Sequence, residues 1–209
     1  MVKIDLKKEL KYLYVPPAKT VQLVEVPRFN FVMIDGAIQP GETPESSTEF
    51  GEAMAALFGL SYTLKFMSKL RKENPIDYTV MAVEGLWWVE GGEFDFVTQQ
   101  TWYWTMMMMQ PNHITQEMYA EAFAQLKKKK DSPGLDRVRF EPFEEGLSVQ
   151  IMHVGPYSEE PMSLEKMKAF AEENGYRYRG KHHEIYLGDP RRAKPEKLRT
   201  VLRHPVEKV

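Results

Sequence analysis

The sequence contains no cysteine among its 209 residues. Disulfide bonds and cysteine-based catalysis are therefore excluded, which agrees with a reducing compartment such as the cytoplasm. The first residues, MVKIDLKKELKYLYVPP, lack the apolar core of a signal peptide, and no apolar run approaches the roughly 18 residues of a membrane helix. We therefore expect a cytoplasmic protein that makes no contact with a membrane.

Positive charge and metal-binding patterns are also scarce. The net charge is -2, so the basic surface of a nucleic-acid-binding domain is missing. The sequence has no glycine-rich phosphate loop and no nucleophile elbow. We expect no cofactor, no metal and no direct binding of nucleic acid, since none of the five histidines has the spacing of a metal-binding helix: His113, His153, His182, His183 and His204.

Apolar residues make up 43% of the sequence, enough for a large core, and their order along the chain repeats. Each half runs strand, turn, helix, strand, strand after an N-terminal arm of residues 1–20. This order predicts a single α+β domain of two modules, about 21–110 and 111–209. We expect them to join into one antiparallel sheet with helices on one face and an open concave face. Apolar periodicity predicts helices over 47–73 and 163–173, and strands over 31–35, 78–90, 96–108, 148–154, 176–187 and 200–206.

The segment TWYWTMMMMQP is apolar on both of its predicted faces. Alternate residues of a strand share a face, so Tyr103 lies opposite a set of four other side chains. Flat rings and adaptable methionines suit a lipophilic pocket. A strand buried on both faces is the alternative interpretation. The four residues predicted to share a face are Trp102, Trp104, Met106 and Met108.

A carboxylate interrupts the strand-like segment HHEIYLG near the C-terminus. Ile185 and Leu187 share one face and are expected to pack on the helices, so His182, Glu184 and Tyr186 should share the concave face.

Glu184 needs a partner there, because a charge on an apolar wall costs free energy unless it is paired or hydrogen-bonded. Burial would raise its pKa and a bound cation would lower it. Glu184 is therefore predicted to anchor a cationic ligand or to act as an acid or base. The alternative is an exposed glutamate on an edge strand, or one paired with Arg191 or Arg192.

The segment VMAVEGLWWV repeats this arrangement after the first predicted helix. Glu84 and Trp88 share a face of the strand, and the face of a Trp ring can hold a cation or stack on a planar ring. Single Trp residues, however, belong more often to a core.

Five segments together resemble the GyrI-like small-molecule-binding family: DLKKELKYLY, VEVPRFNFVMIDG, VMAVEGLWW, MMQPNHITQEMY and HHEIYLGDPRRAKPEKLRTVLRHPV. The resemblance spans nearly the whole chain, and Glu184 and Tyr186 match pocket-side positions of the family. It implies two modules related by a pseudo-twofold axis, with a ligand cleft between them. In multidrug-sensing regulators this domain follows a DNA-binding helix-turn-helix and binds bulky, often cationic aromatic compounds. Twenty residues before the first strand are too few for that segment, so we expect ligand binding without DNA binding.

Stand-alone members similar to this chain hydrolyse cyclopropane-bearing genotoxins of the duocarmycin type. The resemblance implies that Glu184 deprotonates a water, that a tyrosine assists it, and that a tryptophan stacks on the flat drug. We predict a protein that binds planar lipophilic or cationic aromatic molecules, with hydrolytic detoxification as the leading reaction. Sequestration or effector sensing without catalysis, and a gyrase-inhibitor-like interaction module, are the alternatives. The candidate catalytic residues are Glu184, Tyr186 and Tyr157, and the candidate ligand contacts are Glu184, Trp88, Trp102, Trp104, Tyr103, Met106, Met108, Glu84 and His182.

Overall fold

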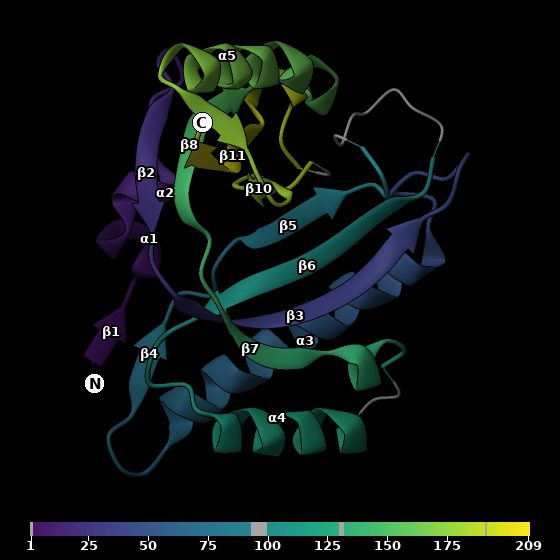
Figure 1. The fold of residues 1–209 in the computed structure, drawn as a ribbon. Helices are drawn as coiled ribbons and strands as arrows, with labels where there is room; N and C mark the ends of the chain where they lie inside the picture. The colour runs from purple at the N-terminus through teal and green to yellow at the C-terminus, as the bar shows by residue number, and fades with distance from the viewer. Residues whose placement is uncertain (1, 93–99, 130–131, 191) are drawn as a thin grey trace. The chain divides into compact units, whose positions relative to one another are not determined.

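The computed structural model describes residues 2–92, 100–129, 132–190 and 192–209, which form two compact units (Figure 1). The units interleave along the chain. Unit 1 consists of residues 1–9, 29–81 and 88–143, and unit 2 consists of residues 10–28, 82–87 and 144–209. Each unit therefore depends on segments that are distant in the sequence.

Unit 1 combines two helices with an antiparallel sheet. Strand β3 (Phe29–Ile38) pairs with β6 (Trp102–Gln110) on one side and with β7 (Arg139–Phe143) on the other. The helices are α3 (Thr48–Leu70) and α4 (Gln116–Lys129). The smaller elements are α1 (Leu6–Glu9), the 3-10 turn η1 (Leu135–Arg137), and the parallel strands β1 (Val2–Ile4) and β4 (Ile76–Tyr78).

Helix α3 begins at a defined cap, because the hydroxyl of Ser47 accepts a hydrogen bond from the backbone N–H of Phe50. Its inner face carries Leu57, Leu60 and Leu64, all completely buried. This spacing confirms the helix that apolar periodicity predicted over 47–73. The predicted strand over 96–108 corresponds to β6, while its residues 96–99 lie outside the described residues.

Unit 2 is built on a longer antiparallel sheet. Its strand order is β2 (Gln22–Val26), β8 (Gly146–Val154), β11 (Arg199–Lys208), β10 (His182–Tyr186) and β5 (Val83–Trp88). The end of β11 also pairs with β9 (Tyr176–Tyr178). The helical elements are α2 (Lys11–Tyr14), α5 (Glu160–Glu173), and the 3-10 turns η2 (Tyr157–Glu159) and η3 (Pro195–Lys197).

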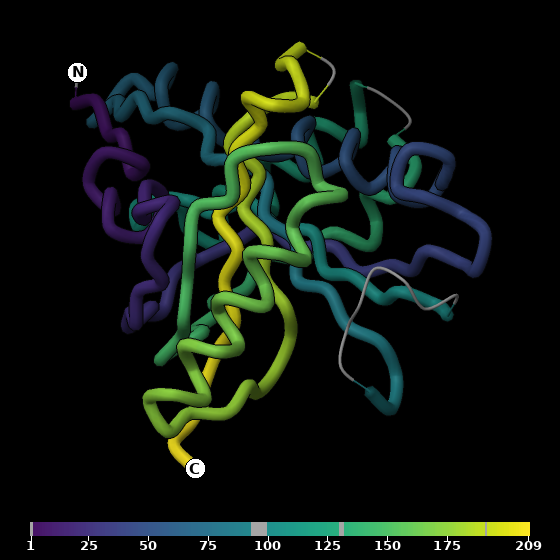
Figure 2. Tube along the Cα trace, turned by 90° about the horizontal axis from the view of Figure 1, so that it is seen from above, coloured from purple at the N-terminus to yellow at the C-terminus, as the bar shows by residue number. Residues whose placement is uncertain are grey.

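Helix α5 lies along β8 and β11 (Figure 2). The side chain of Glu184 lies on the face of the sheet that α5 covers. Glu184 is aligned with Leu202, and Leu202 with Ile151. Both of these apolar residues pack in one cluster with Met167 and Ala171 of α5. Aligned residues of neighbouring strands point to the same face.

This placement corrects one expectation. The alternation of residues along β10 was predicted correctly, but Glu184 was expected on the face opposite the helices. The expectation took Ile185 and Leu187 as the residues that pack on the helices, whereas α5 packs on the face that carries Ile151 and Leu202. The opposite face, with His183 and Ile185, is contacted by α2.

The α+β class with one large antiparallel sheet, predicted from the order of elements, is confirmed. Among the described residues, no helix combines the length and the apolar character needed to cross a membrane.

Candidate functional site

Glu184 lies on an interior strand, because β10 is hydrogen-bonded to β5 on one side and to β11 on the other. Its side chain is buried, with the residue 4% exposed. Nε2 of His182 lies 3.2 Å from one carboxylate oxygen, and the hydroxyl of Tyr186 donates to the other at 2.6 Å. These contacts confirm that the three side chains share a face.

The alternative interpretation of Glu184, an exposed or arginine-paired glutamate on an edge strand, does not hold for the described residues. An exposed glutamate on a sheet edge is excluded by its burial. Arg192 lies near Asp189 instead, at 3.6 Å, and Arg191 lies outside the described residues.

Tyr186 is held from two sides. Its hydroxyl donates to Glu184 and accepts a hydrogen bond from Nε1 of Trp87 at 2.9 Å. Burial, followed by the charge of Glu184, raises the pKa of Tyr186 well above its ordinary value of 10. The phenol therefore keeps its proton and fixes the orientation of the carboxylate. The ring of Tyr157 meets the Tyr186 ring edge-on, with centroids 6.1 Å apart.

Glu160, the first residue of α5, supplies a second buried carboxyl that the sequence analysis did not predict. It is 1% exposed, and neither of its carboxyl oxygens has a hydrogen-bond partner among the described residues. Burial, followed by the negative charge of Glu184, raises the pKa of Glu160 to about 9. Glu160 is therefore protonated at neutral pH, since two neighbouring buried carboxyls cannot both ionise readily.

Further polar side chains lie near the two carboxyls. The side chain of Thr200 lowers the pKa of Glu160. The ring of His204 stacks between those of Tyr178 and His182, with centroids 3.9 and 5.9 Å away. Burial and then His182 lower the pKa of His204 to about 3, so its imidazole is neutral.

We call Trp87, Glu160, His182, Glu184 and Tyr186 the Glu184 cluster. It places a protonated carboxyl near a carboxylate whose orientation is fixed by two hydrogen-bonding side chains. Such a pair can remove a proton from one atom and deliver a proton to another.

A second buried cluster lies on the opposite face of the same sheet, since Glu84 is aligned with Ile185 rather than with Glu184. We call Tyr14, Glu84, Glu145, His183 and Arg203 the Glu84 cluster. Glu84 accepts a hydrogen bond from the hydroxyl of Tyr14 at 2.6 Å, and Nε2 of His183 lies 3.1 Å away. Nδ1 of His183 and a guanidinium nitrogen of Arg203 contact Glu145 at 2.9 and 3.2 Å.

The charged groups of the Glu84 cluster are paired with groups of opposite charge. Burial alone would lower the pKa of His183, but Glu145 and Glu84 raise it to about 9. Burial alone would raise the pKa of Glu145, but His183 and Arg203 lower it to about 2. Two carboxylates thus face two cations, and the structure places Glu84, a predicted ligand contact, among these protein partners.

The predicted contacts from β6 fall into two groups within unit 1. Trp104, Met106 and Met108 are completely buried. The Trp104 ring meets the ring of Phe50 on α3 edge-on at 5.4 Å, and the sulfur of Met108 accepts a hydrogen bond from Ser61. This face of β6 therefore packs on α3 in the core.

The other predicted rings are more accessible. Trp88, Trp102 and Tyr103 are each partly exposed. Trp88 and Tyr103 lie nearly parallel, with ring centroids 5.9 Å apart and an angle of 20° between the planes. A pair of this kind offers a flat aromatic surface. Among the described residues, no group of histidine and carboxylate side chains gathers in a way that could hold a metal ion.

Residues 19–207 match the family model of the GyrI-like small molecule binding domain. The chain belongs to this family. Its function class is therefore the binding of small molecules. No match was found among curated proteins.

Solved structures agree with this assignment. An uncharacterized conserved protein from Listeria innocua is 40% identical, with a TM-score of 0.87, and the match covers 98% of this chain and 100% of that one. Two proteins of Listeria innocua described as hydrolases are 37% and 40% identical, with TM-scores of 0.82 and 0.85 and the same coverage. The C-terminal domain of EcmrR, 13% identical over 91% of this chain and 98% of its own, shares the fold with a TM-score of 0.54.

Two members of the Glu184 cluster escaped the sequence analysis of this GyrI-like chain. Glu160 stands in the segment YSEEPM, where an acidic residue beside proline reads as an ordinary helix start. Trp87 adjoins Trp88, and the register of His182 with Trp87 decides which ring reaches Tyr186. The alternation of side chains along the strand places the two tryptophans on opposite faces. Only the pairing of β5 with β10 identifies Trp87 as the one beside Glu184.

Proposed function

We propose that this chain binds planar lipophilic molecules and hydrolyses those that carry a strained cyclopropane ring, with Glu184 as the general base. The observation that carries the proposal is the buried pair of carboxyls, one of which keeps its proton at neutral pH. Membership of a small-molecule-binding family supports the binding, and the two Listeria proteins described as hydrolases support the reaction class.

The reaction requires one proton to be removed and another to be supplied. Glu184 takes a proton from a water molecule while the oxygen of that water attacks the CH₂ carbon of the cyclopropane ring. The strained carbon–carbon bond breaks, and its electrons move into the conjugated carbonyl, whose oxygen receives a proton from Glu160. A proton transfer from Glu184 to Glu160 then restores both groups, so the net reaction adds one water.

The remaining residues of the Glu184 cluster serve to hold the base. Tyr186 and His182 fix the orientation of the carboxylate, and Trp87 fixes Tyr186. Within unit 1, Trp88 and Tyr103 stack on each other and offer a flat aromatic surface of the kind that planar ligands contact.

The test is incubation with a cyclopropanoid drug in ¹⁸O-labelled water, followed by mass spectrometry. The expected product contains one added water with its oxygen labelled. Loss of the general base in Glu184→Gln should lower the rate about 10²- to 10⁴-fold. Glu165→Gln, an exposed position on α5, is the matched control and should react at the wild-type rate.

Binding is measured separately, by quenching of the fluorescence of the four tryptophans. Quenching without ring opening would identify a sequestering protein and overturn the proposed hydrolysis. If Glu184→Gln bound and hydrolysed the drug at the wild-type rate, the assignment of the base would be wrong.

A further inference from the structure

His153, near the end of β8, lies on the same face of the unit 2 sheet as the Glu184 cluster. Tyr186 is aligned with Thr200 on β11, and Thr200 is aligned with His153. Aligned residues of neighbouring strands point to the same face, so the imidazole continues the row that begins at Tyr186. His153 is buried, with 5% of the residue exposed, and it takes no part in the proton transfers proposed above.

Both ring nitrogens of His153 have partners. Nε2 lies 3.1 Å from the backbone carbonyl oxygen of Pro156, and Nδ1 lies 3.1 Å from the hydroxyl oxygen of Ser163. A carbonyl oxygen can only accept, so Nε2 carries a proton and donates this hydrogen bond. The hydroxyl of Ser163 can then donate to Nδ1. His153 therefore links a backbone group that precedes α5 to a side chain in the first turn of that helix.

The segment between these two partners carries the groups that approach the Glu184 cluster from outside the sheet. It comprises η2 and the start of α5, and it includes Tyr157 and Glu160. The N-cap residue of α5, Glu159, makes no side-chain cap hydrogen bond, so a cap of this kind does not fix the start of the helix. The two contacts of His153 instead fasten both ends of the segment to the sheet.

Gly155 leaves room for this arrangement. Its φ is +143°, a backbone conformation that residues with a side chain rarely adopt. A Cβ atom on Gly155 would lie 3.4 Å from Nε2 of His153 and 3.1 Å from a carboxylate oxygen of Glu159. The backbone N–H of Gly155 donates to the carbonyl of Leu198 at 3.1 Å. The turn between β8 and α5 is therefore closely packed around the imidazole.

We propose that His153 is a positioning residue of the Glu184 cluster. It fastens residues 156–163 to β8 and thereby holds the carboxyl of Glu160 near that of Glu184. The placement itself depends on no reaction, whereas its consequence for ring opening rests on the proposed function. Without the two hydrogen bonds, the start of α5 can move away from the sheet. Glu160 would then gain contact with water and lie farther from the charge of Glu184, so it would release its proton more readily.

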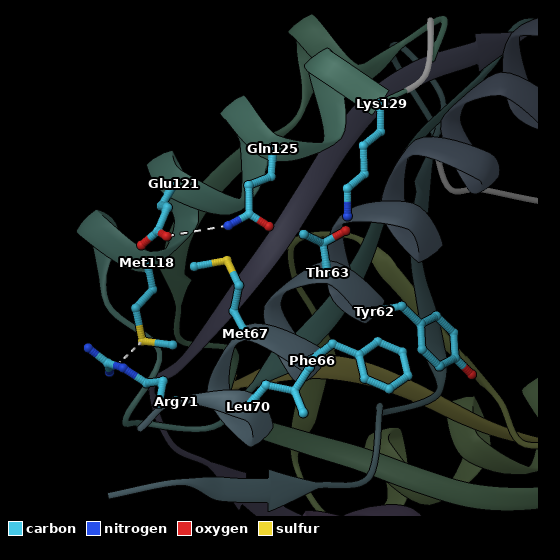
Figure 3. Close-up of a pocket in the computed structure, with 10 residues that line it drawn as sticks. All are labelled: Tyr62, Thr63, Phe66, Met67, Leu70, Arg71, Met118, Glu121, Gln125 and Lys129. Carbon is cyan, nitrogen blue, oxygen red and sulfur yellow. Dashed lines mark hydrogen bonds between the residues drawn. The ribbon is translucent and has the colours of Figure 1, made fainter. Parts of the chain in front are cut away.

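The proton on Glu160 provides a measurement that a loss of stability alone does not change. Infrared spectroscopy detects a protonated carboxyl, and the band that disappears in Glu160→Gln belongs to Glu160. Glu121→Gln is the matched control and should leave this band unchanged. Glu121 is an exposed residue that lines the groove of about 520 Å³ between α3 and α4, where Gln125 donates to its carboxylate at 3.3 Å (Figure 3).

Titration of this band in His153→Leu, which lacks both hydrogen bonds, is the first test. In the wild type the midpoint is expected at about pH 9, the pKa of Glu160. In the variant the acid dissociation constant of Glu160 should rise at least about tenfold, so that the midpoint falls by at least about one pH unit. Glu184 and Thr200, the neighbours that shift the pKa of Glu160, stay unchanged. An unchanged midpoint in the folded variant would overturn the proposal.

Ser163→Ala removes only the contact to Nδ1 and is the second variant. The midpoint should shift in the same direction by a smaller amount. In the His153→Leu background the change should add nothing, because both substitutions break the same interaction. Ser158→Ala, an exposed position in the same segment, is the matched control and should titrate like the wild type. Additive shifts would contradict the shared contact, and if His153→Leu does not fold, an unchanged midpoint in Ser163→Ala would overturn the proposal.

Ring opening separates this inference from the proposed function. In a single turnover, His153→Leu should open the cyclopropanoid drug at least about tenfold more slowly than the wild type, with unchanged fluorescence quenching on binding. If the wild type opens no ring but the midpoint shifts in the variant, the proposed function fails and the positioning role stands. If the wild type opens the ring and the midpoint does not shift, the positioning role alone fails.

Discussion

The two faces of the unit 2 sheet carry buried glutamates with nearly the same hydrogen bonds. Glu84 accepts from Tyr14 at 2.6 Å and lies 3.1 Å from His183. Glu184 accepts from Tyr186 at 2.6 Å and lies 3.2 Å from His182. The two clusters differ in the charged groups that surround this glutamate, tyrosine and histidine.

Beyond its histidine, the Glu84 cluster continues to Glu145 and Arg203, so each buried charge meets an opposite one. The Glu184 cluster instead contains a second carboxyl, Glu160, which keeps its proton because burial and the charge of Glu184 raise its pKa to about 9. In a compensated buried cluster, loss of one partner leaves an unpaired charge and destabilises the fold. A cluster with two carboxyls and one retained proton is suited to chemistry.

Removing the compensating cation should have the largest effect. In Arg203→Met, Glu145 loses one of its two cationic partners, and the carbonyl of Leu13 and the amide of Gln150 lose their donor. We expect the free energy of unfolding to fall by about 3–5 kcal/mol, measured by urea denaturation. Arg177→Met, which breaks the exposed pair with Glu207, should cost less than about 1 kcal/mol. Similar losses in both variants would show that burial of the charge is unimportant.

Tyr186→Phe tests the catalytic side of the comparison. The substitution keeps the ring but removes the donor that orients Glu184. We expect the rate of ring opening in a single turnover to fall about 10- to 100-fold, which corresponds to about 1.4–2.7 kcal/mol. An unchanged rate, with the variant folded, would remove Tyr186 from the proposed mechanism.

Tyr14→Phe is the equivalent change on the opposite face of the sheet. It should lower stability and leave the rate of hydrolysis unchanged. It removes the hydrogen bond to Glu84 and lowers stability by about 1.5–3 kcal/mol. The rate of hydrolysis per folded molecule should stay at the wild-type value. A loss of rate as large as that of Tyr186→Phe would mean that the two clusters are not functionally distinct.

Glu160→Gln should have its smallest effect at about pH 5, and the effect should grow as the pH rises. The pKa of Glu160 is raised to about 9 in the folded chain, above its ordinary value of 4.5. The stability contributed by this protonation is fully present below about pH 4.5 and is lost as the pH rises through about 9. Glutamine does not titrate, so the variant should gain thermal stability relative to the wild type between pH 5 and 9. A difference in melting temperature that is constant over this range would contradict the retained proton.

Local patterns in the sequence were sufficient for the helices and for the face shared by His182, Glu184 and Tyr186. These features follow from periodicity, which each segment expresses by itself. The face covered by α5 was predicted wrongly, because the prediction relied on Ile185 and Leu187 of β10 alone. Ile151 and Leu202 of the neighbouring strands share the face of Glu184 and pack on α5. Glu160 was missed for a related reason: its burial comes from the packing of α5 and not from its own segment.

The hydrogen bond from Arg203 to the carbonyl of Leu13 joins residues 190 positions apart. During synthesis, the Glu84 cluster cannot close until β11 has left the ribosome, and until then Glu84 and Glu145 lack one of their compensating cations. Contacts of such long range slow folding, because the loop must close before the contact forms. The segment around Leu13 is therefore synthesised long before Arg203, its hydrogen-bond partner. The docking of α2 onto the sheet is thus expected as a late step in the folding of unit 2.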